Sequence, residues 1–154
     1  MINIRKYTES DAHAFANIYY NTIHTVNTRD YTEEQVNAWA PSTSVKDYSV
    51  WQEKLAKTQP FVATIGDKVV GFAEFESNGH IDCFYVHHDY QGQAIGSALM
   101  TTIFNEAKKD NIIRIYAEVS ITAKPFFTAK GFRVIKEQMV MIRGVELKNF
   151  VMEK

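Results

Sequence analysis

The stretch YQGQAIGSAL, residues 90–99, constrains this chain most, because it places Gly92, Ala94 and Gly96 between two differently patterned segments. The apolar run IDCFYV precedes it, and apolar residues at helical spacing follow it as far as Ala107. A backbone that approaches an anion closely needs residues without bulk, and a helix N-terminus offers unpaired amides and a positive dipole. The stretch therefore predicts a strand-to-helix turn. From the turn alone, phosphate binding and a purely structural tight turn both stay open.

The turn lacks the features of two common nucleotide-binding loops. No Gly-Lys-Ser/Thr sequence occurs, which excludes a Walker loop. The preceding strands are expected to be antiparallel, and an opening βαβ unit is missing, which argues against a dinucleotide-binding Rossmann fingerprint.

The hydrophobic pattern of the whole chain predicts a mixed α/β fold. Strands are expected at residues 2–7, 61–65, 68–75, 81–86, 112–119, 132–141 and 145–152. Helices are expected from a cap at Thr8 or Ser10 to near Thr25, from a capping box at Thr32 and Gln35 to residue 40, and at 48–57, 98–109 and 122–130. This order favours one mixed, mostly antiparallel central sheet flanked by helices on both faces, within a single domain spanning residues 1–154.

Composition limits the partners. With 45% hydrophobic and 23% charged residues, the chain has an ordinary globular composition, and its only cysteine, Cys83, excludes an intramolecular disulfide. A net charge of -1 gives no reason to propose nucleic acid or an anionic membrane as partner. The N-terminus resembles no signal peptide and no apolar run is long enough to span a bilayer, so a cytoplasmic protein with a small partner is expected. A homodimer paired through the final strand is compatible with the sequence.

Two segments together resemble a known family. IDCFYVHHDYQGQAIGSALM resembles the acetyl-CoA-binding motif of the GNAT superfamily of N-acetyltransferases, and SITAKPFFTAKGF resembles the next motif of that family. The resemblance covers Val69 to Phe132, and the ending GVELKNFVMEK is similar to that of a bacterial subgroup of uncharacterised members. It implies an N-acetyltransferase that uses acetyl-CoA as co-substrate, with direct attack by a primary amine. Separately, no cysteine cluster suggests a metal site, so no metal is expected.

The resemblance also implies which residues bind the co-substrate. Main-chain groups of Phe84, Tyr85 and Val86 are implied to bind the pantetheine arm as an added strand would. Ser120 stands where many members carry Asn and is implied to contact the pantetheine, and Phe127 lies in the same binding region. The pyrophosphate is implied to bind the backbone amides of Gln91, Gly92, Gln93, Ala94, Ile95, Gly96 and Ser97.

Ala94 departs from the commonest family form, which has glycine at this position. A methyl group is compatible with the loop only if the residue has a negative φ angle. Because the family's helix starts there, we expect a negative φ.

Acetyl transfer to an amine needs a base, since a lysine-like amine has a pKa of ~10.4 and is mostly protonated near neutrality. Asp82 is one candidate, because partial desolvation in the run IDCFYV would raise the pKa of its carboxyl; a place on the solvent face of the strand is the alternative. His80 has a suitable natural pKa near ~6.5, although a solvated turn histidine is the simpler interpretation. Glu74 and Glu118 sit at strand positions whose parity could direct them to the same cleft.

The general acid that many family members carry is a tyrosine at the position of Phe127, which has no hydroxyl group. Either the thiolate leaves unassisted, Tyr116 or Tyr85 serves as donor, or catalysis is weak. A non-catalytic acyl-CoA-binding module is therefore the alternative function.

The resemblance places the acceptor amine beside the two N-terminal helices and their loop, with Tyr31, His24 and Trp39 as candidate binding residues. Core packing is the alternative for each aromatic residue. A small amine, an amino acid derivative and a protein N-terminus all remain open as acceptors.

Two other features are given structural interpretations. The side chains of His87 and His88 are expected to point apart on an extended segment, which argues against a metal site. Cys83 is expected to be a core residue without a nearby basic group, which argues against a thiolate nucleophile.

Overall fold

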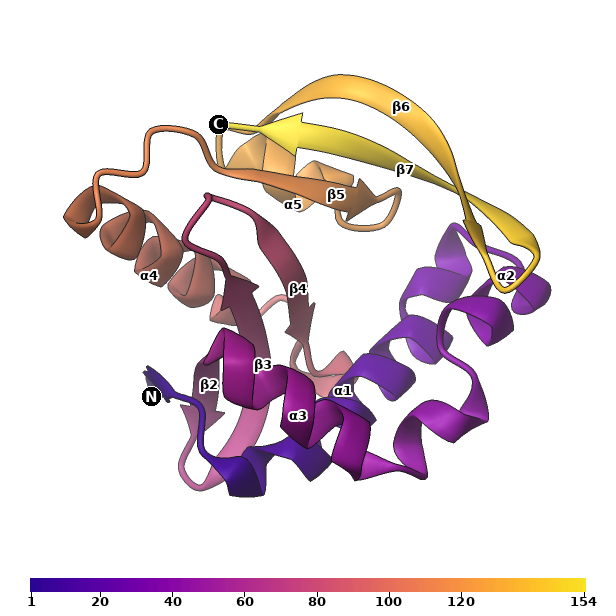
Figure 1. Ribbon diagram of the computed structural model, residues 1–154, viewed down its shortest axis with the longest axis horizontal. Helices are drawn as coiled ribbons and strands as arrows, with labels where there is room; N and C mark the ends of the chain where they lie inside the picture. Colours follow the sequence, from indigo (N-terminus) through magenta and orange to yellow (C-terminus); the bar gives the residue numbers. More distant parts are fainter.

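The computed structural model describes residues 1–154 and contains seven strands and five α-helices, joined in places by short 3-10 turns (Figure 1). The strands are β1 (Ile2–Lys6), β2 (Phe61–Ile65), β3 (Lys68–Phe75), β4 (Ile81–Val86), β5 (Tyr116–Ser120), β6 (Arg133–Ile142) and β7 (Val145–Glu153). The helices are α1 (Ala12–Thr25), α2 (Glu33–Trp39), α3 (Tyr48–Thr58), α4 (Ile95–Lys109) and α5 (Lys124–Ala129). None of these helices combines the length and hydropathy needed to cross a membrane.

The first four strands form an antiparallel sheet in the order β1-β2-β3-β4, and helices cover both of its faces. Alternation along β2 explains this, because successive side chains of a strand point to opposite faces. Phe61 and Ala63 join the cluster that contains Leu99 of α4, whereas Val62 packs in the cluster that contains Phe15 of α1. The sheet is thus held between α4 on one side and α1 with α3 on the other.

The last three strands form a second antiparallel sheet in the order β5-β7-β6. The predicted mixed α/β class with helices on both faces is confirmed, but the single sheet expected from the sequence is divided into two. The two sheets share a single β-bridge, the parallel pairing of His80 with Tyr116, and β4 and β5 diverge from this point (Figure 1). β5 begins at Tyr116, four residues later than predicted from Ile112. The divergence leaves one long edge of β4 without a strand partner.

Helix α2 begins where its predicted capping residues place it, whereas α1 begins only at Ala12, after a 3-10 turn (Glu9–Asp11) that Thr8 caps. Thr32 accepts a hydrogen bond from the Gln35 amide at 3.2 Å, while the Gln35 side chain accepts from the Thr32 amide at 2.9 Å. This reciprocal capping box starts α2 near the first residues of β7. The side-chain amide of Gln35 donates a hydrogen bond to the Glu146 carbonyl at 2.9 Å, and this bond links α2 to the β6–β7 hairpin.

Candidate active site

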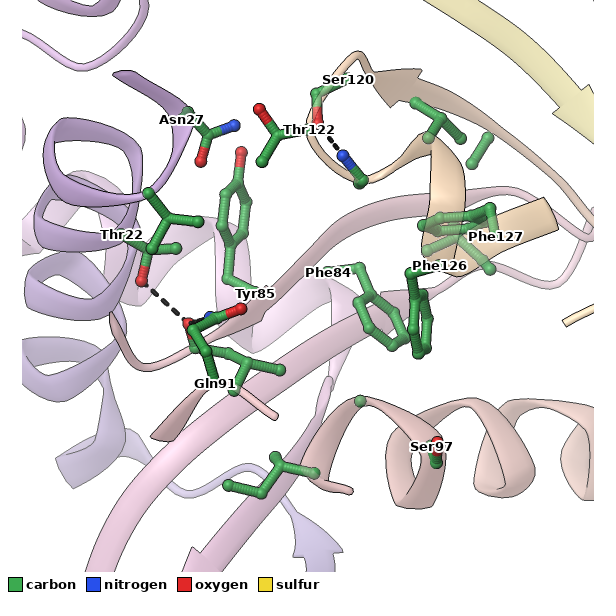
Figure 2. Close-up of a pocket in the computed structure, with 18 of the residues that line it drawn as sticks. Thr22, Asn27, Phe84, Tyr85, Gln91, Ser97, Ser120, Thr122, Phe126 and Phe127 are labelled. Atoms are coloured by element: carbon green, nitrogen blue, oxygen red, sulfur yellow. Dashed lines mark hydrogen bonds between the residues drawn. The ribbon is translucent and has the colours of Figure 1, made fainter. Parts of the chain in front are cut away.

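A cavity of about 410 Å³ lies where β4 and β5 diverge, at the N-terminal end of α4 (Figure 2). Its walls come from β4, β5, the loop before α4, and α5, with α1 closing one side. Most of the residues predicted to bind the co-substrate line it: Phe84, Tyr85, Val86, Gln91, Gly92, Ala94, Ile95, Gly96, Ser97, Ser120 and Phe127. Gln93 belongs to the same loop but not to the cavity wall.

The loop before α4 presents a continuous series of free amide groups. None of the seven backbone N–H groups from Gln91 to Ser97 donates a hydrogen bond to any protein acceptor, and the first amide that does is Ala98, which donates to the Ala94 carbonyl at 3.0 Å. Buried or clustered backbone donors normally find partners. Seven free donors at the start of a 15-residue helix, whose dipole is positive at that end, form a strong anion-binding feature.

The backbone of this loop differs from the expectation at Ala94. Its φ is 67° and its ψ is 12°, in the left-handed region, so the predicted negative φ is wrong. Ala94 is the N-cap of α4 rather than its first helical residue, and the chain reverses direction there with Gly92 also at a φ of 74°. An alanine costs about 1 kcal/mol more than glycine in this conformation, so the loop retains strain of the kind that clusters at binding sites.

A small residue at Gly96 is favoured by packing. A Cβ atom at this position would lie 3.1 Å from the Phe126 ring, closer than ordinary van der Waals contact. Phe126 in turn packs against Phe84 and Phe127, with ring centroids 5.5 Å and 5.8 Å away. The small residue therefore lets α5 close over the start of α4, which narrows one end of the cavity.

The free edge of β4 is suited to an extended ligand. An unpaired strand edge can accept a peptide-like chain through its main-chain groups, as in β-strand addition. The Val86 carbonyl, however, already accepts hydrogen bonds from the Thr22 hydroxyl at 3.0 Å and from the Gln91 side chain at 2.8 Å (Figure 2). Ser120 across the cleft is also engaged, since its hydroxyl accepts from the Ala123 amide at 3.0 Å in the turn that precedes α5. Of the remaining main-chain groups of β4, only those that do not pair with β3 are left for a ligand.

A second cavity, of about 280 Å³, continues from the first toward the β6–β7 hairpin. Trp39, Asp82, Tyr85, Glu118 and Ser120 line both cavities and therefore mark their junction. The second cavity is otherwise lined by Tyr19, Tyr31, Cys83, Val140, Ile142, Leu147, Lys148 and Asn149.

The three predicted acceptor-binding residues differ in placement. Trp39 and Tyr31 line the second cavity, with ring centroids 5.3 Å apart. The Tyr31 hydroxyl donates a hydrogen bond to the Lys148 carbonyl at 2.6 Å and accepts one from the Ile121 amide at 2.9 Å. It therefore also links β7 to the residue that follows β5. His24 lines neither cavity, because its ring contacts the Ala40 carbonyl at 2.7 Å and stacks on Tyr20.

Asp82 reaches the junction of the cavities, but not in apolar surroundings. Its carboxylate lies 3.3 Å from the Lys54 ammonium of α3, and its side chain is 40% exposed. The same ammonium lies 2.9 Å from Glu74. The pKa of Lys54 is raised, because nearby negative charge, including that of Glu74, outweighs the opposing effect of burial. Lys54 was not identified from the sequence, since nothing in the pattern of α3 indicates which strand residues it meets.

Glu74 does not reach the cleft, and the parity argument for it is wrong. Its side chain is completely buried, lines neither cavity, and accepts hydrogen bonds from Lys54 and from the Thr58 hydroxyl at 2.7 Å. The register of β3 against β4 shifts between Ala73 and Phe75, so Glu74 occupies a β-bulge. A bulge redirects a side chain relative to simple alternation, which explains the error.

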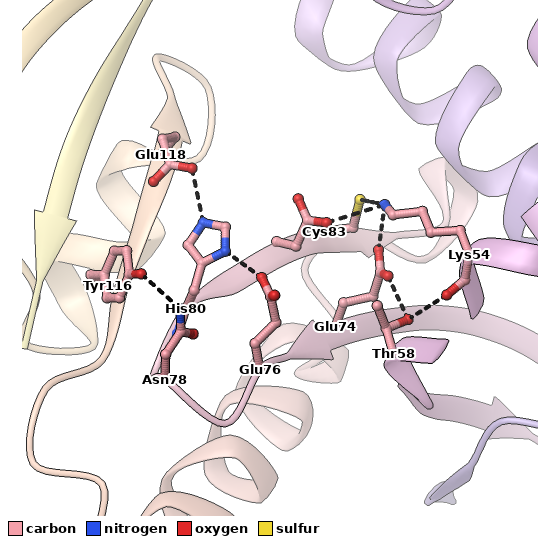
Figure 3. A network of polar contacts seen from close by, with 10 residues as sticks. Lys54, Thr58, Glu74, Glu76, Asn78, His80, Cys83, Tyr116 and Glu118 are labelled. Atoms are coloured by element: carbon pink, nitrogen blue, oxygen red, sulfur yellow. Dashed lines mark hydrogen bonds and ion pairs between the residues drawn. The ribbon is translucent and has the colours of Figure 1, made fainter. Parts of the chain in front are cut away.

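His80 is not a free turn histidine. Its Nδ1 lies 2.5 Å from the Glu76 carboxylate and its Nε2 lies 2.8 Å from the Glu118 carboxylate (Figure 3). Burial opposes protonation of the ring, but the hydrogen bonds to Glu76 and Glu118 outweigh it and raise the pKa of His80. With both ring nitrogens engaged outside the cavities, His80 orients Glu118, whose carboxylate lines both of them.

The two candidate proton donors, Tyr116 and Tyr85, lie in different parts of the structure. Tyr116 lies at the bridge between the sheets, where its hydroxyl accepts from Asn78 at 3.2 Å, and it lines neither cavity. Tyr85 lines both, and burial raises the pKa of its phenol well above the usual value. Phe127 is 3% exposed and packs against Phe84 and Phe132 at the wall of the first cavity.

Cys83 is buried as expected, but a basic group is nearby, contrary to the sequence interpretation. The Lys54 ammonium lies 3.4 Å from its Sγ atom. Burial nevertheless raises the pKa of the thiol well above its usual value, with Glu74 adding to the effect. Cys83 therefore remains a thiol and is poorly suited to act as a nucleophile.

The rings of His87 and His88 stack, with centroids 4.6 Å apart, so the expectation that they point apart is wrong. The two residues lie at the start of a 3-10 turn, where the alternation of an extended strand does not apply. Donor atoms of His87, His88 and Asp89 lie within 4.8 Å of one another, and the absence of a metal there stays a prediction.

Comparison with known proteins agrees with this geometry. A family model described as an acetyltransferase (GNAT) domain matches residues 27–154. The uncharacterized N-acetyltransferase YafP of Escherichia coli is 34% identical over 151 residues, which span 98% of this chain and 94% of that protein. A crystal structure of a GCN5-related N-acetyltransferase from Rhodopseudomonas palustris superposes with a TM-score of 0.92 at 31% identity, covering 99% of this chain and 94% of that one.

The fold also matches a structure that was solved with a ligand. The PaiA N-acetyltransferase of Thermoplasma acidophilum, crystallised in complex with coenzyme A, superposes with a TM-score of 0.79 at 19% identity, over 100% of this chain and 98% of that one.

Proposed function

This chain belongs to the GNAT family of acetyltransferases, and on that basis we propose that it transfers an acetyl group from acetyl-CoA directly to a primary amine. The observation that carries the proposal is the series of seven free amides from Gln91 to Ser97, next to a cavity that continues into a second one. The family model and the relative YafP confirm, at the level of the family, the resemblance that the two sequence motifs carry.

The co-substrate fits the first cavity by the chemistry of its walls. The free amides would bind the pyrophosphate, with the dipole of α4 adding to the attraction. The free edge of β4 would bind the amide-containing pantetheine arm through main-chain groups of Phe84 and Val86, whereas those of Tyr85 face β3 in the antiparallel ladder. Because the Val86 carbonyl already has two donors, its contribution to this binding would come from its amide. When bound, acetyl-CoA would supply the activated acetyl thioester.

The second cavity would hold the acceptor amine, with a base at the junction. Asp82 and Glu118 are the carboxylates that line both cavities, and we assign them the removal of the ammonium proton, directly or through water. Glu74 is excluded from this role by its burial on the α3 side, and His80 acts by orienting Glu118. The backbone amide of Phe84 or Val86 would stabilise the developing oxyanion.

Departure of the thiolate would need little help from the protein. A thiol-like pKa near ~8.5 makes thiolate a fair leaving group. Tyr85 is the phenol at the junction, but its raised pKa makes proton donation to a thiolate unfavourable. We therefore assign Tyr85 a hydrogen-bonding role and assign no general acid to the position of Phe127.

A turnover screen tests the proposal. The purified chain is incubated with acetyl-CoA and a panel of amines, and release of CoA thiol is measured together with the mass of the acetylated product. Sustained thiol release matched by product supports the proposal. CoA binding without turnover for any amine would instead indicate a non-catalytic acyl-CoA-binding module. Absence of binding at millimolar CoA would indicate that the glycine turn has a purely structural role.

A further inference from the structure

The junction of the two cavities carries an uncompensated negative charge. In one network Lys54 is shared between Glu74 and Asp82, and in the other His80 is shared between Glu76 and Glu118 (Figure 3). These four carboxylates face only two cations, so a formal charge of -2 remains even when His80 is protonated. In each network the carboxylate that reaches the cavity is exposed, at 40% for Asp82 and 42% for Glu118.

The rest of the second cavity is aromatic and apolar. Tyr19, Tyr31, Trp39 and Tyr85 form one wall, and Val140, Ile142 and Leu147 form the wall on the hairpin side. Burial raises the pKa of Tyr19 to about 12, and its hydroxyl donates to the Trp39 carbonyl at 3.3 Å, so this phenol adds no charge. Aromatic faces next to carboxylates attract a cation attached to a flat apolar body.

The cavity offers little to bind an anionic group. Lys148 is the only cationic residue in its lining, and its ammonium lies 3.6 Å from the Glu137 carboxylate. Arg143, at the tip of the nearby hairpin, donates to the Ala38 carbonyl at 2.7 Å and the Trp39 carbonyl at 3.4 Å. A free carboxylate on the acceptor would therefore meet the negative junction without a matching partner.

We propose that the acceptor is a small cationic amine with an aromatic body and no carboxylate, bound with its ammonium between Asp82 and Glu118. This inference rests on the proposed function, because it assigns the second cavity to the acceptor. It narrows that function from primary amines in general to one chemical class. It also disfavours free amino acids, whose carboxylate would be repelled.

Binding of three matched probes tests this class without relying on turnover. Phenethylamine, 2-phenylethanol and phenylalanine share the phenyl body but carry an ammonium, a neutral hydroxyl, and an ammonium with a carboxylate, respectively. Calorimetric titration of each into the full chain should give phenethylamine a dissociation constant at least about tenfold lower than either of the others. Equal binding of all three, or tighter binding of phenylalanine, would overturn the inference.

Isosteric variants test which side chains produce the preference for an ammonium group. Glu118→Gln and Asp82→Asn remove one negative charge each while keeping the shape, and each should reduce the preference for phenethylamine over 2-phenylethanol by about fivefold or more. Asp67→Asn makes the same chemical change in the exposed β2–β3 turn and should leave the preference unaltered. An unchanged preference in both cavity variants would refute the placement of the ammonium.

A separate CoA titration on the same samples keeps the two proposals distinct. CoA binding and turnover with a preference for anionic amines would uphold the proposed function and overturn the acceptor class. Selective phenethylamine binding without any CoA binding would support the ligand class and overturn the proposed function.

Discussion

The Lys54 ammonium lies 3.3 Å from the Asp82 carboxylate, which ties a carboxylate at the junction of the two cavities to helix α3. The same ammonium neutralises the fully buried Glu74 at 2.9 Å. Lys54 therefore has two roles, because it orients a candidate base and also compensates a charge that could not be buried alone.

Replacing Lys54 by Met should destabilise the protein by about 1–3 kcal/mol, because Glu74 would remain buried without its cation; the side chain of Lys54 is 38% exposed, which limits the loss. Urea denaturation measures this change. Adding Glu74→Gln in the Lys54→Met background should recover most of the loss, since the amide can still accept from Thr58. If the second substitution lowers stability further, the charge-compensation argument is wrong.

Ser97→Asp should weaken CoA binding by about tenfold or more, because a carboxylate in the first turn of α4 would repel a bound pyrophosphate. Folding stability should not fall, since an acidic residue is favourable at a helix N-terminus. Ser97→Asn is the matched neutral control and should bind CoA within about threefold of the parent. Calorimetry on both variants makes the comparison, and equal affinities would argue against pyrophosphate binding at this turn.

Ala94→Gly should raise the stability by about 1 kcal/mol, because glycine adopts the observed φ of 67° without strain. Ala98→Gly, four residues on within α4, provides a control of opposite sign and should lower stability by about the same amount. Thermal unfolding of the two variants tests the left-handed conformation directly. A loss of stability in Ala94→Gly would contradict it.

His80 should stabilise the fold most at mildly acidic pH. Its folded-state pKa is raised, so its contribution is fully present below the unfolded value of about 6.5 and is lost as the pH rises through the folded-state value. The difference in free energy of unfolding between the parent and His80→Gln should therefore be larger at pH ~5.5 than at pH ~8.5. A difference that is constant or grows with pH would exclude the ion pairs with Glu76 and Glu118 as its source.

Features set by local sequence were predictable. The capping box at Thr32 and Gln35, the end of the first helix near Thr25 and the hairpin strands follow from spacing and turn residues, and the structure reproduces them. The glycine turn was placed correctly between β4 and α4 for the same reason.

Features set by irregular backbone or long-range contacts were not predictable. The bulge at Glu74 and the left-handed Ala94 break the regular periods on which sequence interpretation depends. Lys54 and Cys83 are 29 positions apart, and only the packing of α3 on the sheet brings them together. The division into two sheets likewise depends on how β4 and β5 diverge beyond the His80–Tyr116 bridge.

We propose that the free amides of residues 91–97 hold the pyrophosphate of CoA beside the β4 edge. Titration of ¹⁵N-labelled protein with CoA, followed by amide NMR, tests this placement. We predict large saturable shifts for the amides of Gln91 to Ser97 and smaller ones along β4, with none in the β2–β3 turn at Gly66 and Asp67. Saturating CoA that leaves the amides of residues 91–97 unshifted would contradict the account.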